Sequence, residues 1–335
     1  MSVAELVGRA VRARLSMLDA AHEGAWRLFA GPLEGAPRFV VDVYARTLVV
    51  HDHGGEDADE AGAIEVVKAA RDHLPWARAA VWKLHGARDD EARAGRLLFG
   101  TKDEVDRKIT EGGVRYAIEL MLHQDASFYV DTRELRAWLR ANMAGKRVLN
   151  TFAYTGSLGV AARAAPAAVV VHVDRSKPFL NVAKQSYAMN GFEVSRADFR
   201  AADFYEATSR LRKEGALFDC VIVDPPFFAT SGRARVDAVG DFGRLLAKVR
   251  PLVADGGALV AVNNALFVSG AEQTRALEEH CADGYASVEA LIGVPEDCTG
   301  FAETRTGAPP KDPAPFVHST KIAVLRVRRK DARTA

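Results

Sequence analysis

The chain has 335 residues, of which 48% are hydrophobic and 27% charged, with a net charge of +1, as in an ordinary folded protein of two or three domains. No apolar run approaches the ~20 residues of a membrane helix and no secretory signal follows Met1, so we expect no membrane association. The three cysteines, Cys220, Cys281 and Cys298, form no CxxC pair, which disfavours disulfides and a metal site and predicts a reducing, cytoplasmic location.

The first part of the chain predicts a helix followed by a small α/β domain. Apolar side chains recur at helical spacing over residues 3–20, so we take 1–23 as an N-terminal helix. Residues 24–126 then read as strands, a helix and a hairpin, in the order strand 26–29, strand 38–50, helix 64–73, strand 79–84 and a turn at Gly112-Gly113. No catalytic constellation stands out there, and a role in substrate recognition is the expectation for this domain.

From residue 127 to 330 strands and helices alternate, which predicts an α/β fold with a parallel sheet covered on both faces. Thr132 is expected to cap the first helix. The expected strands are 148–150, 168–174, 196–202, 218–224, 258–263, 285–292 and 321–327, and the expected later helices are 157–164, 176–190, 236–254 and 269–283.

A polar turn with spaced glycines follows the first of these strands. We call residues 151–156 the glycine turn; it leads from Asn150 through Thr151-Phe152-Ala153-Tyr154-Thr155-Gly156 into a helix start. Such a turn lies at the carboxyl end of a strand, where ligands of open α/β sheets bind, and its glycines allow close approach of the backbone. Alone, the pattern is more often a plain strand–helix connection.

Three later strands end on an acid, and a fourth ends on an asparagine pair. The acids are Asp174, Asp203 and Asp224, and the pair begins at Asn263. Asp174 lies 24 positions after Asn150, the spacing at which an acid reaches ribose hydroxyls in nucleotide-binding folds. One such acid is usually a helix cap, but three in register favour a binding cleft.

The sequence Asp224-Pro225-Pro226-Phe227-Phe228 is the most specific short motif. Two prolines fix the backbone and remove its donors, so Asp224 and the neighbouring carbonyls can accept hydrogen bonds from a base. A phenylalanine ring after them can stack on the base. A proline-terminated strand followed by core phenylalanines is the alternative, and the motif alone leaves both open.

In this order and spacing, these motifs resemble class I S-adenosylmethionine-dependent methyltransferases. More closely, residues 128–133, the Asn-Thr-Phe-Ala-Tyr-Thr-Gly run and Asp-Pro-Pro resemble the bacterial large-subunit (23S) ribosomal RNA methyltransferases of the cytosine-5 and guanine-N7 branch. The resemblance covers 127–330 and implies a Rossmann-like, seven-stranded sheet whose last strand is antiparallel. Residues 24–126 are similar to the small central domain of the cytosine-5 members. Their N-terminal PUA domain is not expected here, since only about 22 residues precede the match.

The resemblance implies S-adenosylmethionine as cofactor and assigns roles by position. The cofactor residues it implies are Phe152, Tyr154, Thr155 and Gly156 around the methionine part, Asp174 at the ribose, Asp203 and Phe204 at the adenine, and Phe128, Asp131 and Arg133 closing the pocket, with Asn150 and Arg175 beside them. The catalytic residues it implies are Asp224, Pro225, Pro226, Phe227 and Asn263, which would face the methyl group and the target base.

The target atom is where the chain departs from the cytosine-5 members. Cytosine-5 methylation needs a thiolate that attacks the ring, and the position of that cysteine reads Val262-Asn263-Asn264-Ala265 here. The asparagine pair resembles the guanine-N7 branch, in which a ring nitrogen already offers a lone pair and needs only alignment. Amino-group methylation stays open, because Phe227 replaces the Lys or Thr usual after the prolines.

The expected function is therefore S-adenosylmethionine-dependent methylation of a ribosomal RNA base, with RNA as partner, no metal and a homodimer left open. Residues 1–126 hold 17 basic and 21 acidic side chains, so the remainder carries 28 and 23, an excess compatible with a polyanion. Methylation of a small molecule or protein, and a non-catalytic module that binds the cofactor or RNA, are the alternatives. The long segment 293–320 is either a substrate-recognition loop or an inert excursion.

Overall fold

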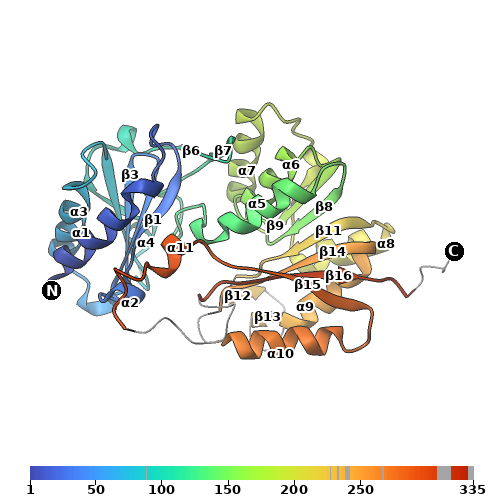
Figure 1. The fold of residues 1–335 in the computed structure, drawn as a ribbon. Coiled ribbons are helices and arrows are strands. Elements are labelled where there is room, and N and C mark those ends of the chain that lie inside the picture. The colour runs from blue at the N-terminus through green and yellow to red at the C-terminus, as the bar shows by residue number, and fades with distance from the viewer. Residues whose placement is uncertain are drawn as a thin grey trace. The chain divides into compact units, whose positions relative to one another are not determined.

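The computed structural model describes residues 1–87, 89–226, 228–231, 234–237, 242–265, 268–307 and 318–330. The chain forms two compact units (Figure 1). Unit 1 is Met1–Asp131 with the described part of Pro295–Pro309, and unit 2 is Thr132–Val294 with the described part of Pro310–Ala335. The division thus falls at Asp131, and the N-terminal helix belongs to unit 1.

Unit 1 is built on a five-stranded sheet in the order β1-β2-β3-β4-β5. Its neighbouring strands are antiparallel except β3 and β4, which are parallel and joined by α3 (Glu60–Arg71). Helix α1 (Val3–Arg14) packs beside α3 over a shared apolar core (Figure 1). The strands are β1 (Ala25–Ala30), β2 (Phe39–Tyr44), β3 (Thr47–Asp52), β4 (Ala79–Leu84) and β5 (Arg96–Phe99), and the smaller elements include α2 (Gly31–Glu34), α4 (Asp90–Ala94), β6 (Lys108–Glu111) and β7 (Val114–Ala117).

The single strand expected over residues 38–50 is wrong, because a tight turn divides it into β2 and β3. Ala45 lies at this turn with φ 51°, in the left-handed region that non-glycine residues rarely adopt. The turn carries no glycine, proline or asparagine, so the sequence gives no local sign of it. The hairpin predicted around Gly112-Gly113 is confirmed as β6 and β7.

Part of the long segment after β15 belongs to unit 1. Helix α11 (Glu296–Thr299) packs on β1, where the Asp297 Oδ2 atom accepts from the backbone N–H of Arg27 at 2.9 Å. The Asp297 carbonyl accepts from Arg14, whose guanidinium forms a buried ion pair with Glu34 at 3.0 Å. Residues 295–307 therefore complete the fold of unit 1, whereas residues 308–317 of the expected recognition loop lie outside the described residues.

Unit 2 contains a seven-stranded sheet in the order β10-β9-β8-β11-β14-β16-β15, which confirms the predicted methyltransferase-type architecture (Figure 1). The first five strands are parallel, and β16 is antiparallel to both of its neighbours. The strands are β8 (Arg147–Thr151), β9 (Val169–Asp174), β10 (Phe199–Ala201), β11 (Phe218–Val223), β14 (Val253–Asn263), β15 (Ala286–Ile292) and β16 (Lys321–Val327).

Helices cover both faces of this sheet, as its nearly continuous apolar strands predict. One face packs on α5 (Arg133–Asn142) and α6 (Ser157–Ala164). The other packs on α8 (Phe204–Lys213), α9 (Phe242–Val249) and α10 (Gly270–Cys281). Helix α7 (Lys177–Met189) lies next to β9 and β10.

Two local expectations in unit 2 are wrong, and a third is correct only in position. The helix expected over 236–254 is shorter: a hairpin of β12 (Phe228–Ser231) and β13 (Ala234–Asp237) precedes α9, and β14 already begins at Val253. The strand expected over 196–202 is only β10, after a short 3-10 turn. Thr132 lies at the N-cap position of α5, as expected, but its side chain makes no capping hydrogen bond; its hydroxyl oxygen accepts from the Arg136 guanidinium at 2.7 Å instead. Within the described ranges, no helix is both long and apolar enough to cross a membrane.

Candidate active site

The expected site residues of unit 2 follow the carboxyl ends of parallel strands, which all lie at one edge of the sheet. The chain runs from β8 outward to β9 and β10 and then returns to β11 on the other side of β8, so the strand order reverses between β8 and β11. Ligands of open α/β sheets bind at such a reversal point. The Thr151 hydroxyl donates to the Ile222 carbonyl at 2.6 Å and so joins the two strand ends there.

The glycine turn after β8 is held in an unusual conformation. Phe152 (φ 53°), Tyr154 (φ 50°) and Gly156 (φ 79°) are all left-handed. For a residue with a side chain this conformation costs about 1–2 kcal/mol, and it persists only where the surroundings enforce it. Here the Ala153 N–H donates to the Val173 carbonyl at 2.9 Å, which ties the turn to the end of β9. Strained turns of this kind are concentrated at binding sites.

Asp174 connects this turn to the end of β9. Its Oδ2 atom accepts from the Tyr154 N–H and its Oδ1 atom from the Ser176 N–H, both at 2.8 Å. Burial raises the pKa of Asp174, while these two hydrogen bonds act in the opposite direction. The Arg175 N–H also bonds to this carboxylate, and an ionised carboxylate has about four acceptor positions, so acceptor capacity remains for hydroxyl donors such as those of a ribose. The neighbouring Arg175 is exposed.

Aromatic rings line up along the same edge. The Phe152 ring stacks on that of Phe204, with centroids 4.7 Å apart and an interplanar angle of 17°. The Tyr154 ring meets Phe179 edge-on at 4.5 Å. Asp203 begins α8, where its Oδ1 atom accepts from a backbone N–H two residues on at 2.9 Å. The structure therefore brings the predicted ribose and adenine residues to one edge, each also engaged within the chain.

The Asp-Pro-Pro loop, residues Asp224, Pro225 and Pro226, follows β11 and therefore leaves the sheet beside the glycine turn. Asp224 is half-buried, Pro225 is buried and Pro226 is exposed. Phe227, which we predicted as a catalytic residue, lies outside the described residues.

Asn263 ends β14 with its side chain 2% exposed. Its amide nitrogen donates to the Gln273 side chain at 2.8 Å and its amide oxygen accepts from the Ala265 N–H at 2.9 Å. Asn263 thus attaches helix α10 to the sheet in this structure, and a contact with substrate would require these bonds to open.

The three residues expected to close the cofactor pocket are divided between the units. Phe128 belongs to unit 1, where its carbonyl accepts from the Tyr44 hydroxyl at 2.8 Å and its ring packs edge-on against Tyr116. Asp131 also belongs to unit 1, while Arg133 begins α5 of unit 2.

One residue that supports the site was not predicted: His172 of β9. A Cβ atom on Gly159 would lie 2.3 Å from the His172 ring, and one on Gly156 would lie 3.2 Å from it. The imidazole stacks on Phe199 and bonds to the Tyr187 hydroxyl at 3.0 Å. The glycines at the start of α6 therefore make room for a buried histidine. A histidine inside an apolar strand, with glycines three apart in the preceding helix start, is the signal that could have found it.

Buried polar groups also lie beside this histidine. Burial lowers the pKa of His172 to about 3, so its ring is neutral. Asn150 is its partner in the β8–β9 register and is only 1% exposed. Within the described part of the chain, neither the Asn150 amide nor the Nδ1 atom of His172 has a hydrogen-bond partner. Buried polar groups of this kind normally bind a water molecule or a ligand, so this strand end fits a polar cofactor above it.

None of the three cysteines has the environment of a reactive thiolate. Burial raises the pKa of Cys220 to about 12, and it also raises the pKa of Cys298 and of Cys281. A thiol needs a lowered pKa and access to the substrate to act as a nucleophile. Among the described residues, no group of three or more His, Cys, Asp or Glu side chains is arranged to hold a metal ion.

Comparison with known proteins identifies the family. The family model described as S-adenosylmethionine-dependent methyltransferase matches residues 75–296, more than half of the chain. The ribosomal RNA large subunit methyltransferase I of Erwinia tasmaniensis is 30% identical over 240 residues, 70% of this chain and 60% of that protein. Its namesake from Photobacterium profundum is 31% identical over 260 residues, 74% of this chain and 64% of that protein. The chain thus spans less than two thirds of the length of these relatives.

Solved structures show the same fold. A putative methyltransferase complexed with SAH has a TM-score of 0.82 at 20% identity, covering 97% of this chain and 80% of that chain. A putative SAM-dependent methyltransferase from Streptococcus mutans has a TM-score of 0.80 at 19% identity, with the same coverage. The match of the family model confirms the expected fold, enzyme class and cofactor. The chain belongs to the S-adenosylmethionine-dependent methyltransferases.

Proposed function

We propose that the protein methylates a base of ribosomal RNA, at a ring nitrogen of the guanine-N7 kind or at an exocyclic amino group. The observation that carries the proposal is the position of the Asp-Pro-Pro loop, which leaves β11 beside the glycine turn at the reversal point of the sheet. The large-subunit ribosomal RNA methyltransferases at 30% and 31% identity supply the substrate class.

In this proposal the carboxyl edge of unit 2 holds the cofactor. The left-handed glycine turn contacts the methionine part, the remaining acceptor positions of Asp174 take the ribose hydroxyls, and Asp203 with Phe204 binds the adenine. Asn150, Arg175 and Arg133 extend the set in unit 2, whereas Phe128 and Asp131, which the sequence resemblance also assigns to the cofactor, belong to unit 1. When bound, S-adenosylmethionine supplies a methyl group activated by the positive sulfur.

The Asp-Pro-Pro loop orients the target base. Its two proline nitrogens cannot donate, and the Asp224 carboxylate and the backbone carbonyls of the loop can accept from the N–H groups of a base. A ring nitrogen attacks with its own lone pair, so the step requires alignment and no covalent intermediate. The raised pKa values of all three cysteines favour this route over cytosine-5 chemistry, which needs a thiolate.

The proposal is tested by mapping ribosomal RNA modifications by mass spectrometry in a strain that lacks the protein. We expect one methylated base to be lost, to return with the parent gene, and to stay absent with Asp224→Asn. Asp219→Asn is the matched control, because Asp219 lies at the opposite end of β11 and accepts from the Arg147 N–H. It should restore the modification.

An unchanged modification pattern in the deletion strain would contradict the RNA proposal and favour a small-molecule or protein substrate. Restoration by Asp224→Asn equal to that of the parent would remove the Asp-Pro-Pro loop from the reaction. In the strain complemented with the parent gene, cell fractionation tests the expected cytoplasmic location, and size-exclusion chromatography of the purified protein tests the homodimer that the sequence leaves open.

A further inference from the structure

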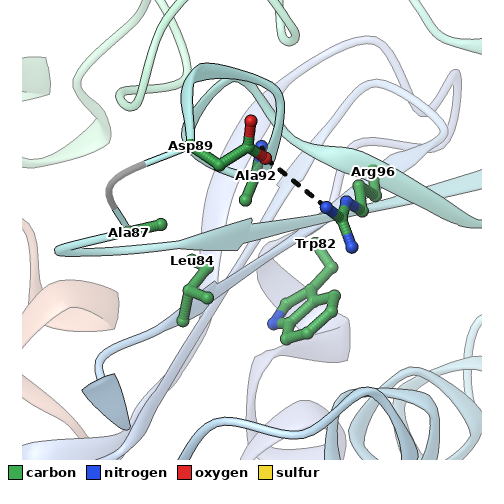
Figure 2. A pocket seen from close by; sticks show the side chains of 6 residues that line it. All are labelled: Trp82, Leu84, Ala87, Asp89, Ala92 and Arg96. Carbon is green, nitrogen blue, oxygen red and sulfur yellow. Dashed lines mark hydrogen bonds and ion pairs between the residues drawn. The ribbon is translucent and has the colours of Figure 1, made fainter. Parts of the chain in front are cut away.

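Unit 1 contains a pocket of about 350 Å³ that none of the roles above uses (Figure 2). It lies between the end of β4, the edge strand β5 and helix α4. Its volume is at the lower end of the about 300–1,000 Å³ of ligand pockets, which suits one planar ring system rather than a larger molecule. The lining residues are Trp82, Leu84, Ala87, Asp89, Ala92 and Arg96.

The aromatic surface of the pocket is fixed in place. The Trp82 indole nitrogen donates to the Oδ2 atom of Asp52 at 3.1 Å. The same carboxylate is held by two bonds from Arg38, each 2.9 Å long. Trp82 is 7% exposed, so the surrounding core fixes most of its ring and the pocket opens on the small part of the side chain that remains. Aromatic side chains held in this way are the usual stacking surfaces for unpaired RNA bases.

Two opposite charges lie at the rim. Arg96 is the cross-strand neighbour of Trp82, and its guanidinium lies 3.4 Å from the Asp89 carboxylate (Figure 2). Both side chains are about half exposed, so their ion pair contributes little and can open at low cost. Asp89 is already oriented, because it caps α4 by accepting from the Ala92 N–H at 2.8 Å. The rim of the pocket thus offers one oriented hydrogen-bond acceptor, the Asp89 carboxylate, and one group of hydrogen-bond donors, the Arg96 guanidinium.

This combination discriminates between ligand classes. A phosphate would be attracted by Arg96 but repelled by Asp89 next to it. A purely apolar ligand would leave both charges unused. A heterocycle with N–H donors on one edge and acceptors on another satisfies both, and guanine has this arrangement: N1–H and the N2 amino group can donate to Asp89, while O6 and N7 accept from Arg96.

We propose that this pocket binds one unpaired guanine base of the RNA substrate, stacked on Trp82 and read by Asp89 and Arg96. The inference rests on the proposed RNA methyltransferase function and specifies it further: unit 1 would select the RNA through a base other than the one that is methylated. It would supply the substrate-recognition role expected for residues 24–126.

The test is equilibrium binding of the full chain, without cofactor, to fluorescently labelled single-stranded RNA. The probes are oligouridines with a central guanosine, adenosine or cytidine. We expect the guanosine oligomer to bind about tenfold more tightly, which is about 1.4 kcal/mol. Asp89→Asn and Arg96→Gln should each abolish this preference. Asparagine retains the capping oxygen, so the first variant keeps the fold. Arg107→Gln removes an equally exposed arginine of unit 1 outside the pocket and should change nothing.

Salt dependence separates a base contact from a phosphate contact. An arginine that neutralises a phosphate of single-stranded RNA contributes about 0.7 to the slope of log affinity against log salt. Arg96→Gln should therefore lower the affinity for the guanosine oligomer and leave the slope unchanged. Trp82→Phe, which retains a stacking ring, should bind more tightly than Trp82→Leu, with circular dichroism reporting the fold of both.

Equal binding of all three oligomers by the parent, no effect of the rim variants, or a slope reduced by Arg96→Gln would each overturn the inference. A parent that methylates ribosomal RNA but fails these tests would remove the pocket and keep the proposed function. A parent that binds guanosine through the pocket but leaves ribosomal RNA unmodified would remove the proposed function and keep the pocket.

Discussion

Gly159→Ala is the substitution that most sharply tests the packing beneath the glycine turn. Alanine in place of glycine inside a helix normally stabilises a protein by up to about 1 kcal/mol. Here the new Cβ would lie 2.3 Å from the His172 ring, a distance that real side chains do not reach. The ring has little room to move, because it stacks on Phe199 at 4.9 Å and bonds to Tyr187.

Overpacking of a filled core costs about 1–3 kcal/mol, and the short distance places this case at the upper end. Alanine's higher helix propensity offsets up to about 1 kcal/mol of this cost, so we expect Gly159→Ala to lower the unfolding free energy by about 2 kcal/mol. For a domain of 150–250 residues that corresponds to a melting temperature lower by about 4–8 °C in calorimetry. Cofactor affinity, measured by isothermal titration, should fall as well, since Gly159 lies in the first turn of α6 directly after the glycine turn.

Gly243→Ala is the matched control, because Gly243 is an exposed residue of α9 whose added Cβ would meet no atom of the described residues within 4 Å. It should leave the melting temperature unchanged or raise it. In a His172→Ala background the clash disappears, so Gly159→Ala should become neutral or stabilising there. A Gly159→Ala protein as stable as the parent, or a loss of the same size in both backgrounds, would refute this account of the packing.

Three further predictions concern charge and thiols. Burial lowers the pKa of Lys83 to about 8, whereas its pKa in the unfolded chain is about 10.4. Between these pH values the folded state binds fewer protons than the unfolded state, so the unfolding free energy should rise with pH by about 1–3 kcal/mol. Lys83→Met should abolish this rise in denaturant titrations. Asp174→Ala should weaken S-adenosylmethionine binding in calorimetry by about 10–100-fold, because two hydrogen bonds to a charged acceptor are lost, and unchanged affinity would exclude the ribose role. Replacing Cys220, Cys281 and Cys298 together by alanine should leave the methylation rate within about threefold of the parent, whereas abolished activity in a folded variant would indicate a thiolate mechanism.

Much of the fold could be predicted where the local pattern and the tertiary structure agree. The strands expected at 79–84 and 321–327 are observed with the same bounds, since each is an apolar run in the interior of its sheet. The turn at Ala45 could not be predicted, because a left-handed alanine is imposed by the pairing of β2 with β3. The prediction of one helix over 236–254 was wrong, because this range contains the end of β13, the two-turn helix α9 and the start of β14.

In the candidate site, too, the sequence predicts positions along the strands but not the contacts that come from tertiary structure. Acids at strand ends could be placed on one edge, since parallel strands end together, and the structure brings Asp174, Asp203 and Asp224 there. The hydrogen bond between Asp174 and the Tyr154 N–H joins the ends of two neighbouring strands and could not be predicted from the local sequence, whereas Asp203 caps α8, the usual role of a single acid at a strand end. His172 was missed because its contacts with Gly159 and Tyr187 come from the neighbouring helices α6 and α7, and the spaced glycines suggest room for a ligand rather than for a side chain.

The most direct test of the central claim is methyl transfer by the purified chain. The protein is incubated with S-adenosylmethionine carrying a labelled methyl group and with unmodified large-subunit ribosomal RNA, and the digested nucleosides are separated by mass spectrometry. We predict label in a single nucleoside, methylated at a ring nitrogen or an amino group. Label on carbon 5 of cytosine, or none in RNA while the protein binds the cofactor, would contradict the account.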